Sequence, residues 1–190
     1  NYNDWRTLVN SLDTSDKQQM IIYLAAVTGL RFAEVVGLTL KSIDFGQSTL
    51  TVSQTWDYKY HTGFKPPKNK SSIRTIPIDA RTTQRLKVFT NNIQDNNEPI
   101  FAAASPAPVS AEINKTLTGI LESLDLPRIT FHGLRHTHAS VLLYRGVSVL
   151  SVSKRLGHAN ITTTQSTYLH VIKELEQLDN DKIISVLNNL

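Results

Sequence analysis

Five side chains have chemical types that fit one task, the handling of a phosphate group. Arg31 stands in T-G-L-R-F-A-E, Lys68 in P-K-N-K, His132 and Arg135 in H-G-L-R-H, and Tyr168 follows L-G-H-A-N-I-T-T-T-Q-S-T. His132 and Arg135 are three residues apart at the entrance of a predicted helix, so both project from one face, where free amides also favour an anion. A guanidinium among the apolar residues of this helix usually has a carboxylate or phosphate partner.

These positions also have ordinary structural interpretations. Arg31 could be a solvated surface residue, or it could pair with Glu34 one turn on. His132 could be the N-cap of its helix or a hydrogen-bonded core histidine. Tyr168 could be a packing residue, although the hydroxyl-rich run before it, T-T-T-Q-S-T, makes a poor core face and predicts a phenol near the surface.

A run of basic residues marks the predicted tip of a hairpin. Lys65, Lys70 and Arg74 flank Lys68 and are candidate DNA-binding residues, although a solvated hairpin with a slight preference for phosphates is the simplest interpretation. A flexible ammonium on such a loop could also reach a leaving oxygen.

Three histidines close together raise the question of a metal site. His136 lies four residues after His132, which is a common spacing of zinc ligands on a helix, and His138 follows. No HExxH glutamate, cysteine or carboxylate cluster completes a coordination shell, so we expect no metal there.

The elements that must position these residues predict a mainly α-helical domain with a small antiparallel β-sheet or hairpin. Residues 48–56, 58–64 and 73–78 alternate as strands do, and two prolines make 65–72 an exposed tip. A helix, a break at Gly29 and a second helix up to Gly37 precede these strands. The remaining helical patterns cover 82–91, 110–124, 133–144, 149–156, 162–168, 171–178 and 182–190.

Composition narrows the class of protein. A chain of 190 residues with 40% hydrophobic and 19% charged residues fits one globular domain and excludes a disordered one. No stretch approaches the roughly 20 apolar residues of a membrane span. The absence of cysteine excludes disulfide scaffolds and thiol nucleophiles, and the net charge of +4 gives a mild preference for polyanions.

Taken together and in this order, the residues resemble the tyrosine recombinase, or phage integrase, family. The likeness is greatest to integrases of phages and conjugative transposons from Gram-positive bacteria. The matching segments are T-G-L-R-F-A-E-V-V-G-L (28–38), P-K-N-K-S-S-I-R-T-I-P-I (67–78), F-H-G-L-R-H-T-H-A-S (131–140), and L-G-H followed by Tyr168. They cover most of the chain.

The resemblance implies the tyrosine recombinase catalytic-domain fold and a site-specific recombinase that cleaves and rejoins DNA through a 3′-phosphotyrosyl intermediate. The family's catalytic pattern falls on Arg31, Lys68, His132, Arg135, His158 and Tyr168. Lys70 or Lys65 could take the place of Lys68.

Each of these residues then has an expected role. Arg31, Arg135 and His158 bind the nonbridging oxygens, and Tyr168 is the nucleophile. His132 is the natural acceptor of the tyrosine proton, and the lysine protonates the leaving 5′ oxygen. Because the covalent bond stores the phosphodiester energy and fixed cations neutralise charge, we expect no cofactor and no metal.

The same resemblance predicts partners and organisation. The expected partner is double-stranded DNA at attachment sites, with a homotetramer in the synaptic complex, a monomer free in solution, and an accessory excision or DNA-bending protein. No membrane is involved, and the expected location is cytoplasmic, on the DNA of a bacterial host. Residues 1–12 end a linker from an N-terminal DNA-binding domain, 13–180 form the catalytic domain, and 181–190 form a C-terminal helix able to dock in trans.

Two other functions fit part of the pattern. A DNA-binding module could use the same residues to grip backbone phosphates without cleaving. A nicking enzyme of the type IB topoisomerase kind could cleave and reseal a strand without recombining two sites.

Overall fold

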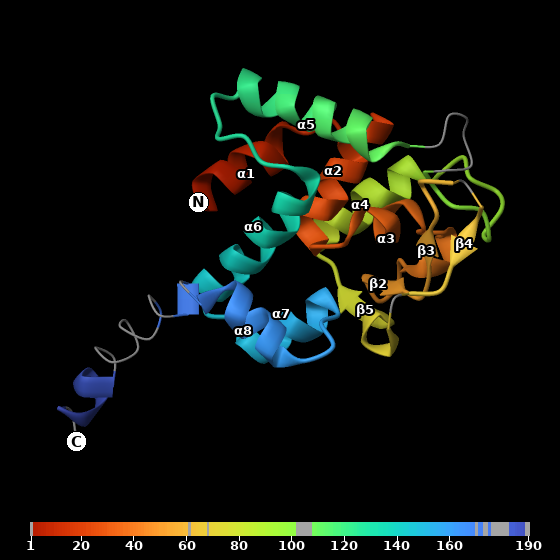
Figure 1. Ribbon diagram of the computed structural model, residues 1–190. Coiled ribbons are helices and arrows are strands. Elements are labelled where there is room, and N and C mark those ends of the chain that lie inside the picture. Colours follow the sequence, from red (N-terminus) through yellow and green to blue (C-terminus); the bar gives the residue numbers. More distant parts are fainter. Residues whose placement is uncertain are drawn as a thin grey trace.

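Helices form most of the molecule, and short strands gather on one side of them (Figure 1). The computed structural model describes residues 2–60, 62–67, 69–101, 108–169, 171–172, 175 and 183–188. The helices are α1 (Tyr2–Ser11), α2 (Lys17–Thr28), α3 (Phe32–Val36), α4 (Ala80–Phe89), α5 (Ser110–Ser123), α6 (Phe131–Tyr144), α7 (Val149–Leu156) and α8 (Ile161–Thr167), with 3-10 helices η1 (Leu40–Ser42) and η2 (Lys70–Ser72). The strands are β1 (Ile43–Asp44), β2 (Thr49–Val52), β3 (Thr55–Trp56), β4 (Phe64–Lys65) and β5 (Arg74–Pro77).

Helix α2 is the centre of the main core. Its start is fixed by Asp16, whose carboxylate accepts a hydrogen bond from the Gln19 amide, and its end by Gly29 in the left-handed conformation. Helices α1, α3, α5 and α6 pack around it, so the seven consecutive side chains from Met20 to Ala26 are all buried. Because α2 is central, the backbone carbonyls at its C-terminal end lie inside the molecule, where side chains of other elements can donate hydrogen bonds to them.

The larger sheet has the antiparallel order β1-β2-β5, and Leu50 lies opposite Ile76 in its register. Leu50, Val52 and Ile76 point into the core, as the alternation predicts. The predicted strand 48–56 is divided, because β3 leaves this sheet and pairs with β4.

The strand predicted for 58–64 was wrong except at its last residue. The Asp57 carboxylate accepts hydrogen bonds from the amides of Lys59 and Tyr60 and from the hydroxyl of Thr62. These bonds close a turn, and they satisfy donors that a strand would have presented to a neighbour.

A second, smaller apolar cluster lies beyond the main core. It consists of Ala139, Leu143, Val152, Leu156, Tyr168 and Val171. Helix α6 connects the two clusters, because Phe131 and Leu134 belong to the main core and the later residues of the helix belong to the second. In Figure 1, α7 and α8 accordingly lie at the far end of α6 from α5.

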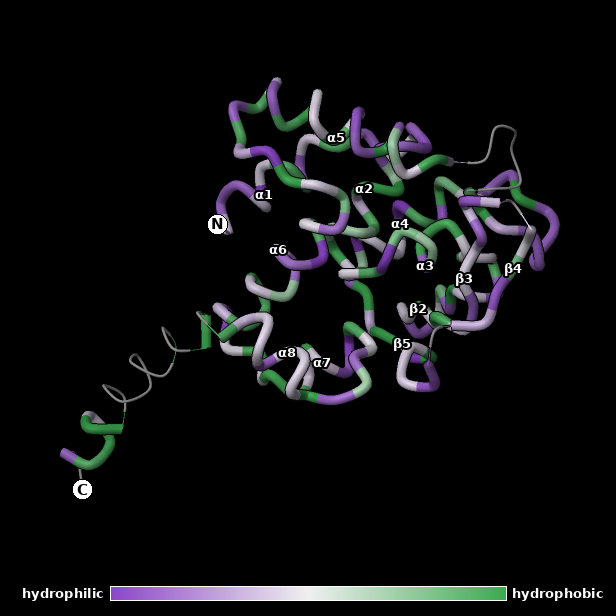
Figure 2. The backbone as a smooth tube through the Cα atoms, in the orientation of Figure 1, coloured by the Kyte–Doolittle hydropathy of each residue, from purple (hydrophilic) through white to green (hydrophobic). Residues whose placement is uncertain are grey.

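The two ends of the chain differ. Helix α1 lies on the main core through Leu8 and Val9, and the Trp5 indole donates to the Ala26 carbonyl. Residues 183–187 are helical, and the exposed fractions of Ile183, Ile184 and Leu187 lie between 54% and 58%. Figure 2 shows this stretch as a hydrophobic segment apart from the core. Among the described helices, none combines the length and apolar character needed to cross a membrane.

The left-handed turn at Gly29 gives a stability prediction. A Cβ at this position would lie 2.8 Å from both Cδ2 of His138 and Cδ2 of Leu156, on a backbone with φ of 71°. We expect Gly29→Ala to lower the free energy of unfolding by about 2–4 kcal/mol, measured by urea denaturation.

The matched control is Gly119→Ala. Gly119 lies in the middle of α5 with open space around its Cα, so this change should stabilise the helix by about 0.5–1 kcal/mol. Equal effects of the two substitutions would contradict the assigned role of the turn.

Candidate active site

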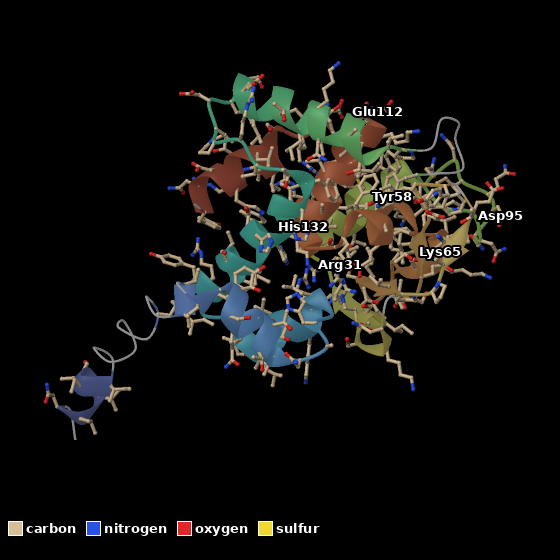
Figure 3. All side chains as sticks on the ribbon, in the orientation of Figure 1. Arg31, Tyr58, Lys65, Asp95, Glu112 and His132 are labelled. Atoms are coloured by element: carbon tan, nitrogen blue, oxygen red, sulfur yellow. The ribbon has the colours of Figure 1, made fainter. Side chains whose placement is uncertain are left out.

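Helix α6 carries the centre of the candidate site. Its N-cap is Thr130, whose hydroxyl accepts from the Gly133 amide, and His132 is an exposed first-turn residue. His132 is therefore neither the N-cap nor a core residue. Arg31 and His132 lie near each other at the middle of the molecule (Figure 3), and together with Arg135 they line a cavity of about 330 Å³.

Arg135 is buried, with an exposed fraction of 3%, and it joins three elements. Its Nη1 donates to the Gly29 carbonyl at 2.7 Å, and its Nη2 donates to the Leu156 carbonyl at 2.7 Å. The expectation of a carboxylate or phosphate partner was wrong for these two donors, because backbone carbonyls at two helix ends take them. Burial and, second, the charge of Arg31 lower the pKa of Arg135 to about 10, so it is cationic at neutral pH.

Arg31 is paired with Glu34, which confirms one of the alternatives left open by the sequence. Arg31 donates to the Glu34 carboxylate from its backbone amide at 2.8 Å and from Nη1 at 2.9 Å. The Arg31 side chain keeps an exposed fraction of 40%, whereas that of Glu34 is 2%. Arg31 is therefore held in place by a buried carboxylate while its guanidinium remains open to a ligand.

Arg74 is the second cation on Glu34. Its Nη1 and Nη2 donate to the two carboxylate oxygens at 3.1 Å and 3.0 Å. Burial alone would raise the pKa of Glu34, but the hydrogen bond and charge of Arg74, followed by those of Arg31, bring it below its ordinary value. Glu34 is therefore a buried carboxylate that stays ionised.

The position of Arg74 does not fit the DNA-binding role predicted from the sequence. Its side chain is 6% exposed. Besides Glu34, it donates from Nε to the Arg155 carbonyl at 2.6 Å and from Nη1 to the Ser72 carbonyl at 2.8 Å. Arg74 holds β5 against α3 and the end of α7, and its donors are directed at protein groups.

Arg155 completes this junction from α7. Its guanidinium donates to His138 Nε2 at 3.0 Å, to the Pro77 carbonyl at 2.9 Å and to the Val27 carbonyl at 3.2 Å. His138 in turn bonds the Ala26 carbonyl through Nδ1 at 3.1 Å, and burial, followed by the charge of Arg155, lowers its pKa to about 3. His138 is thus a neutral structural residue.

His158 lies just beyond the end of α7. Its Nδ1 is 2.7 Å from the Thr164 hydroxyl, and a hydroxyl that donates there leaves the proton on Nε2, where it can be given to a ligand. Burial, and then the charges of Arg135 and Arg31, lower the pKa of His158 to about 4. Burial followed by the charges of His136 and Arg135 also lowers the pKa of His132.

Tyr168 is buried, with an exposed fraction of 2%, so the prediction of a phenol near the surface was wrong. Its ring packs in the second cluster, and within the threonine run before it Thr164 also turns inward. Its hydroxyl lies 3.1 Å from Nδ1 of His136. Burial raises the pKa of Tyr168, which the charge of Arg135 partly offsets.

His136 is the residue that sequence reasoning missed. Its ring lies edge-on to that of His132, with centroids 4.8 Å apart, and its centroid is 5.8 Å from that of the Tyr168 ring. The available signal was the four-residue spacing from His132, which places both rings on one face of the helix. That spacing had been interpreted only as a possible spacing of metal ligands. Within the described residues, no group of three or more histidines and carboxylates is placed to hold a metal ion.

The basic hairpin is only partly described. Lys68 lies outside the described residues. Lys65 is exposed and forms an ion pair with Asp57 at 2.6 Å, and Lys70 is an exposed residue at the start of η2. The assignment of Lys65 and Lys70 as DNA contacts stays a prediction.

Comparisons with known proteins agree with this geometry. The model of the phage integrase family matches residues 2–174. The chain is 33% identical over 178 residues to a XerC-like tyrosine recombinase of Caldanaerobacter subterraneus subsp. tengcongensis, covering 80% of this chain and 45% of the relative. It is 31% identical over 171 residues to an integrase of Staphylococcus phage L54a, covering 82% and 48%.

Among solved structures, the Tn1549 transposon integrase in complex with circular intermediate DNA has a TM-score of 0.70 at 22% identity, covering 91% of this chain and 64% of that one. The XerA recombinase has a TM-score of 0.70 at 19% identity, covering 94% and 62%. These likenesses confirm the fold predicted from the sequence. The chain spans about half the length of the curated relatives it matches.

The buried carboxylate gives the next prediction. Arg74→Ala removes one of the two guanidiniums on Glu34, and we expect a loss of about 3–5 kcal/mol in the free energy of unfolding. The exposed neighbour Lys70 provides the matched control, since Lys70→Ala should change this energy by less than about 0.5 kcal/mol. Urea denaturation of both variants checks the result.

A compensating pair tests the cause of that loss. Adding Glu34→Gln to Arg74→Met neutralises the carboxylate that was left behind, so the double variant should recover part of the stability lost in Arg74→Met alone. If Arg74→Ala were as mild as Lys70→Ala, the assigned structural role of Arg74 would be wrong.

Proposed function

The chain belongs to the phage integrase family, and we propose on that premise that it is the catalytic part of a site-specific DNA recombinase. In this proposal it cleaves and rejoins DNA through a 3′-phosphotyrosyl intermediate during integration or excision of a mobile element or phage. The observation that supports it most is the pair of hydrogen bonds from Arg135 to Gly29 and Leu156. These bonds hold the chain segments that carry Arg31 and His158 against α6, the helix that also contacts Tyr168.

The proposed chemistry uses fixed cations to neutralise the reacting phosphate. Arg31 and Arg135 donate to the nonbridging oxygens, and His158 adds a hydrogen bond through Nε2. The Tyr168 oxygen attacks phosphorus, the bond to the 5′ oxygen breaks, and Lys68 protonates that oxygen. Because the phosphotyrosyl bond preserves the energy of the phosphodiester, rejoining needs neither ATP nor another cofactor, and we propose no metal.

The proposed substrate is double-stranded DNA carrying attachment sites. Two structural neighbours support this choice, since the Tn1549 integrase was solved with circular intermediate DNA and the XerH recombinase with its difH substrate. In this proposal Lys65 and Lys70 contact the DNA backbone. We further propose a homotetramer in the synaptic complex, a monomer in solution, an accessory excision or DNA-bending protein, and action on DNA in the cytoplasm of a bacterial host.

The proposed organisation follows the sequence pattern. In this proposal residues 1–12 end a connection from an N-terminal DNA-binding domain and pack through α1 on the main core, 13–180 form the catalytic domain, and 181–190 dock on a neighbouring protomer. The exposed apolar side chains of residues 183–187 support the last assignment, because such a stripe needs a covering surface.

Covalent trapping tests the catalytic proposal. On candidate attachment-site DNA nicked beside the cleavage position, the cleaved fragment diffuses away, so the wild-type chain should accumulate an adduct that resists detergent. Tyr168→Phe should bind the same DNA with unchanged affinity and form no adduct, because only the attacking oxygen is lost. The control Tyr144→Phe changes an exposed tyrosine of α6 and should form the adduct at the wild-type rate.

The outcomes separate the alternative functions. A wild-type chain that binds but forms no adduct would be a DNA-binding module. An enzyme that relaxes supercoils but never recombines two marked sites would be of the topoisomerase kind.

Deletion of residues 182–190 tests the assembly proposal. We expect near-normal binding of single DNA sites, at least a tenfold loss of tetramers on paired sites in native gels, and poor strand exchange. Val88→Ser, which removes an exposed apolar side chain elsewhere, should leave assembly unchanged. If the truncated chain aggregates, the segment normally covers an apolar surface of its own domain. If the truncated chain recombines normally, the segment has no role in tetramer assembly.

A further inference from the structure

The hydroxyl of Tyr168 needs a proton acceptor before it can attack. Burial raises the pKa of this phenol, so at neutral pH it is protonated and a poor nucleophile. A nearby base is the usual solution, and it must lie within hydrogen-bonding distance of the hydroxyl.

His136 meets that geometric requirement. Its Nδ1 is 3.1 Å from the Tyr168 oxygen, and among the described residues it is the titratable side chain that is hydrogen-bonded to the hydroxyl. The His132 ring contacts that of His136, with ring centroids 4.8 Å apart, and among the described residues His132 forms no hydrogen bond with the Tyr168 hydroxyl. The sequence suggested His132 as the proton acceptor, but the histidine within hydrogen-bonding distance of the hydroxyl is His136, one helical turn further along.

The surroundings of His136 suit a base. The side chain is exposed, and with Tyr168 it lines a pocket of about 750 Å³ between α1, α6 and the chain after α8. The other titratable groups that face this region are Tyr2 on α1, Tyr144 and His132 on α6, and His158 after α7, while Arg31 and Arg135 supply the positive charge.

We propose that His136 is a catalytic residue, the general base that takes the proton of Tyr168. This assignment rests on the proposed function. As the tyrosine oxygen forms its bond to phosphorus, the O–H bond breaks and the proton moves to Nδ1 of His136, which becomes imidazolium. The bond between phosphorus and the 5′ oxygen breaks, and that oxygen leaves as a hydroxyl with a proton from Lys68. In rejoining, the 5′ hydroxyl gives its proton to Lys68 and forms a bond to phosphorus, the bond between phosphorus and the tyrosine oxygen breaks, and His136 returns its proton to that oxygen.

His136→Asn is the first test, because an amide retains a hydrogen bond near the Nδ1 position and cannot act as a base. In single-turnover cleavage of nicked DNA at pH 7, we expect a loss of about 10²–10³-fold with unchanged DNA affinity. The acid limb of the wild-type pH–rate profile should disappear. The loss should persist when the leaving oxygen is replaced by sulfur, because that substitution helps only the leaving group.

Chemical rescue separates a base from a structural residue. His136→Gly leaves an open pocket beside the hydroxyl, so added imidazole should restore adduct formation in a saturable manner. Ser140→Ala, a change to another lining residue one turn further along α6, should cleave at the wild-type rate without imidazole. Because His136 is exposed, His136→Asn should unfold close to the urea concentration of the wild-type chain, whereas His136→Gly should lose about 1 kcal/mol, the cost of a glycine inside α6.

The results decide between the two histidines. If His136→Asn cleaves normally, or if imidazole rescues His132→Gly and not His136→Gly, the assignment to His136 is wrong while the proposed function stands. If the wild-type chain itself forms no adduct, the proposed function and this assignment fall together.

Discussion

Two hydrogen bonds of a single buried side chain hold the candidate site together. The Arg135 guanidinium donates to the Gly29 carbonyl at the end of α2 and to the Leu156 carbonyl at the end of α7. A buried cation that left these donors unpaired would be costly, so the native fold must keep both helix ends against α6. Arg31 follows Gly29 by two residues and His158 follows Leu156 by two, and both are therefore positioned by Arg135.

The charge of the site follows from the same arrangement. Arg31 and Arg74 share the carboxylate of Glu34, while Arg135 and Arg155 are bonded to neutral groups in the described structure. Four guanidiniums and one bonded carboxylate leave the junction strongly positive. Burial followed by the neighbouring arginine charges keeps His158 neutral, so it can donate a hydrogen bond without adding to the repulsion. A phosphate that gains negative charge as it reacts is the ligand this balance favours.

Local patterns predicted what depends on neighbours in sequence. The spacing of apolar residues marked helices such as α5 and α7, and the motif around Arg135 marked the site. The prediction was wrong where distant contacts decide the outcome. The sequence predicted Arg74 as a surface residue of a basic hairpin. In the structure its guanidinium donates hydrogen bonds to Glu34, 40 residues earlier, and to Arg155, 81 residues later. Tyr168 likewise follows a polar run, and its burial comes from residues of α6 and α7.

The division of the core separates the proposed phosphate-binding groups from the proposed nucleophile. Arg31 follows the central helix of the main core, whereas Tyr168 packs in the second cluster, to which six buried residues of the described part of the chain belong. A small cluster with few apolar contacts opens at a lower free energy than a large core, so Tyr168 can move while Arg31 and Arg135 stay fixed. The backbone carbonyl of Leu156 limits that motion, because the side chain of this residue packs in the second cluster and its carbonyl accepts a hydrogen bond from Arg135. Tyr168 is thus connected to Arg135 through α6, by its contact with His136 and its packing on Ala139 and Leu143, and also through the backbone carbonyl of Leu156.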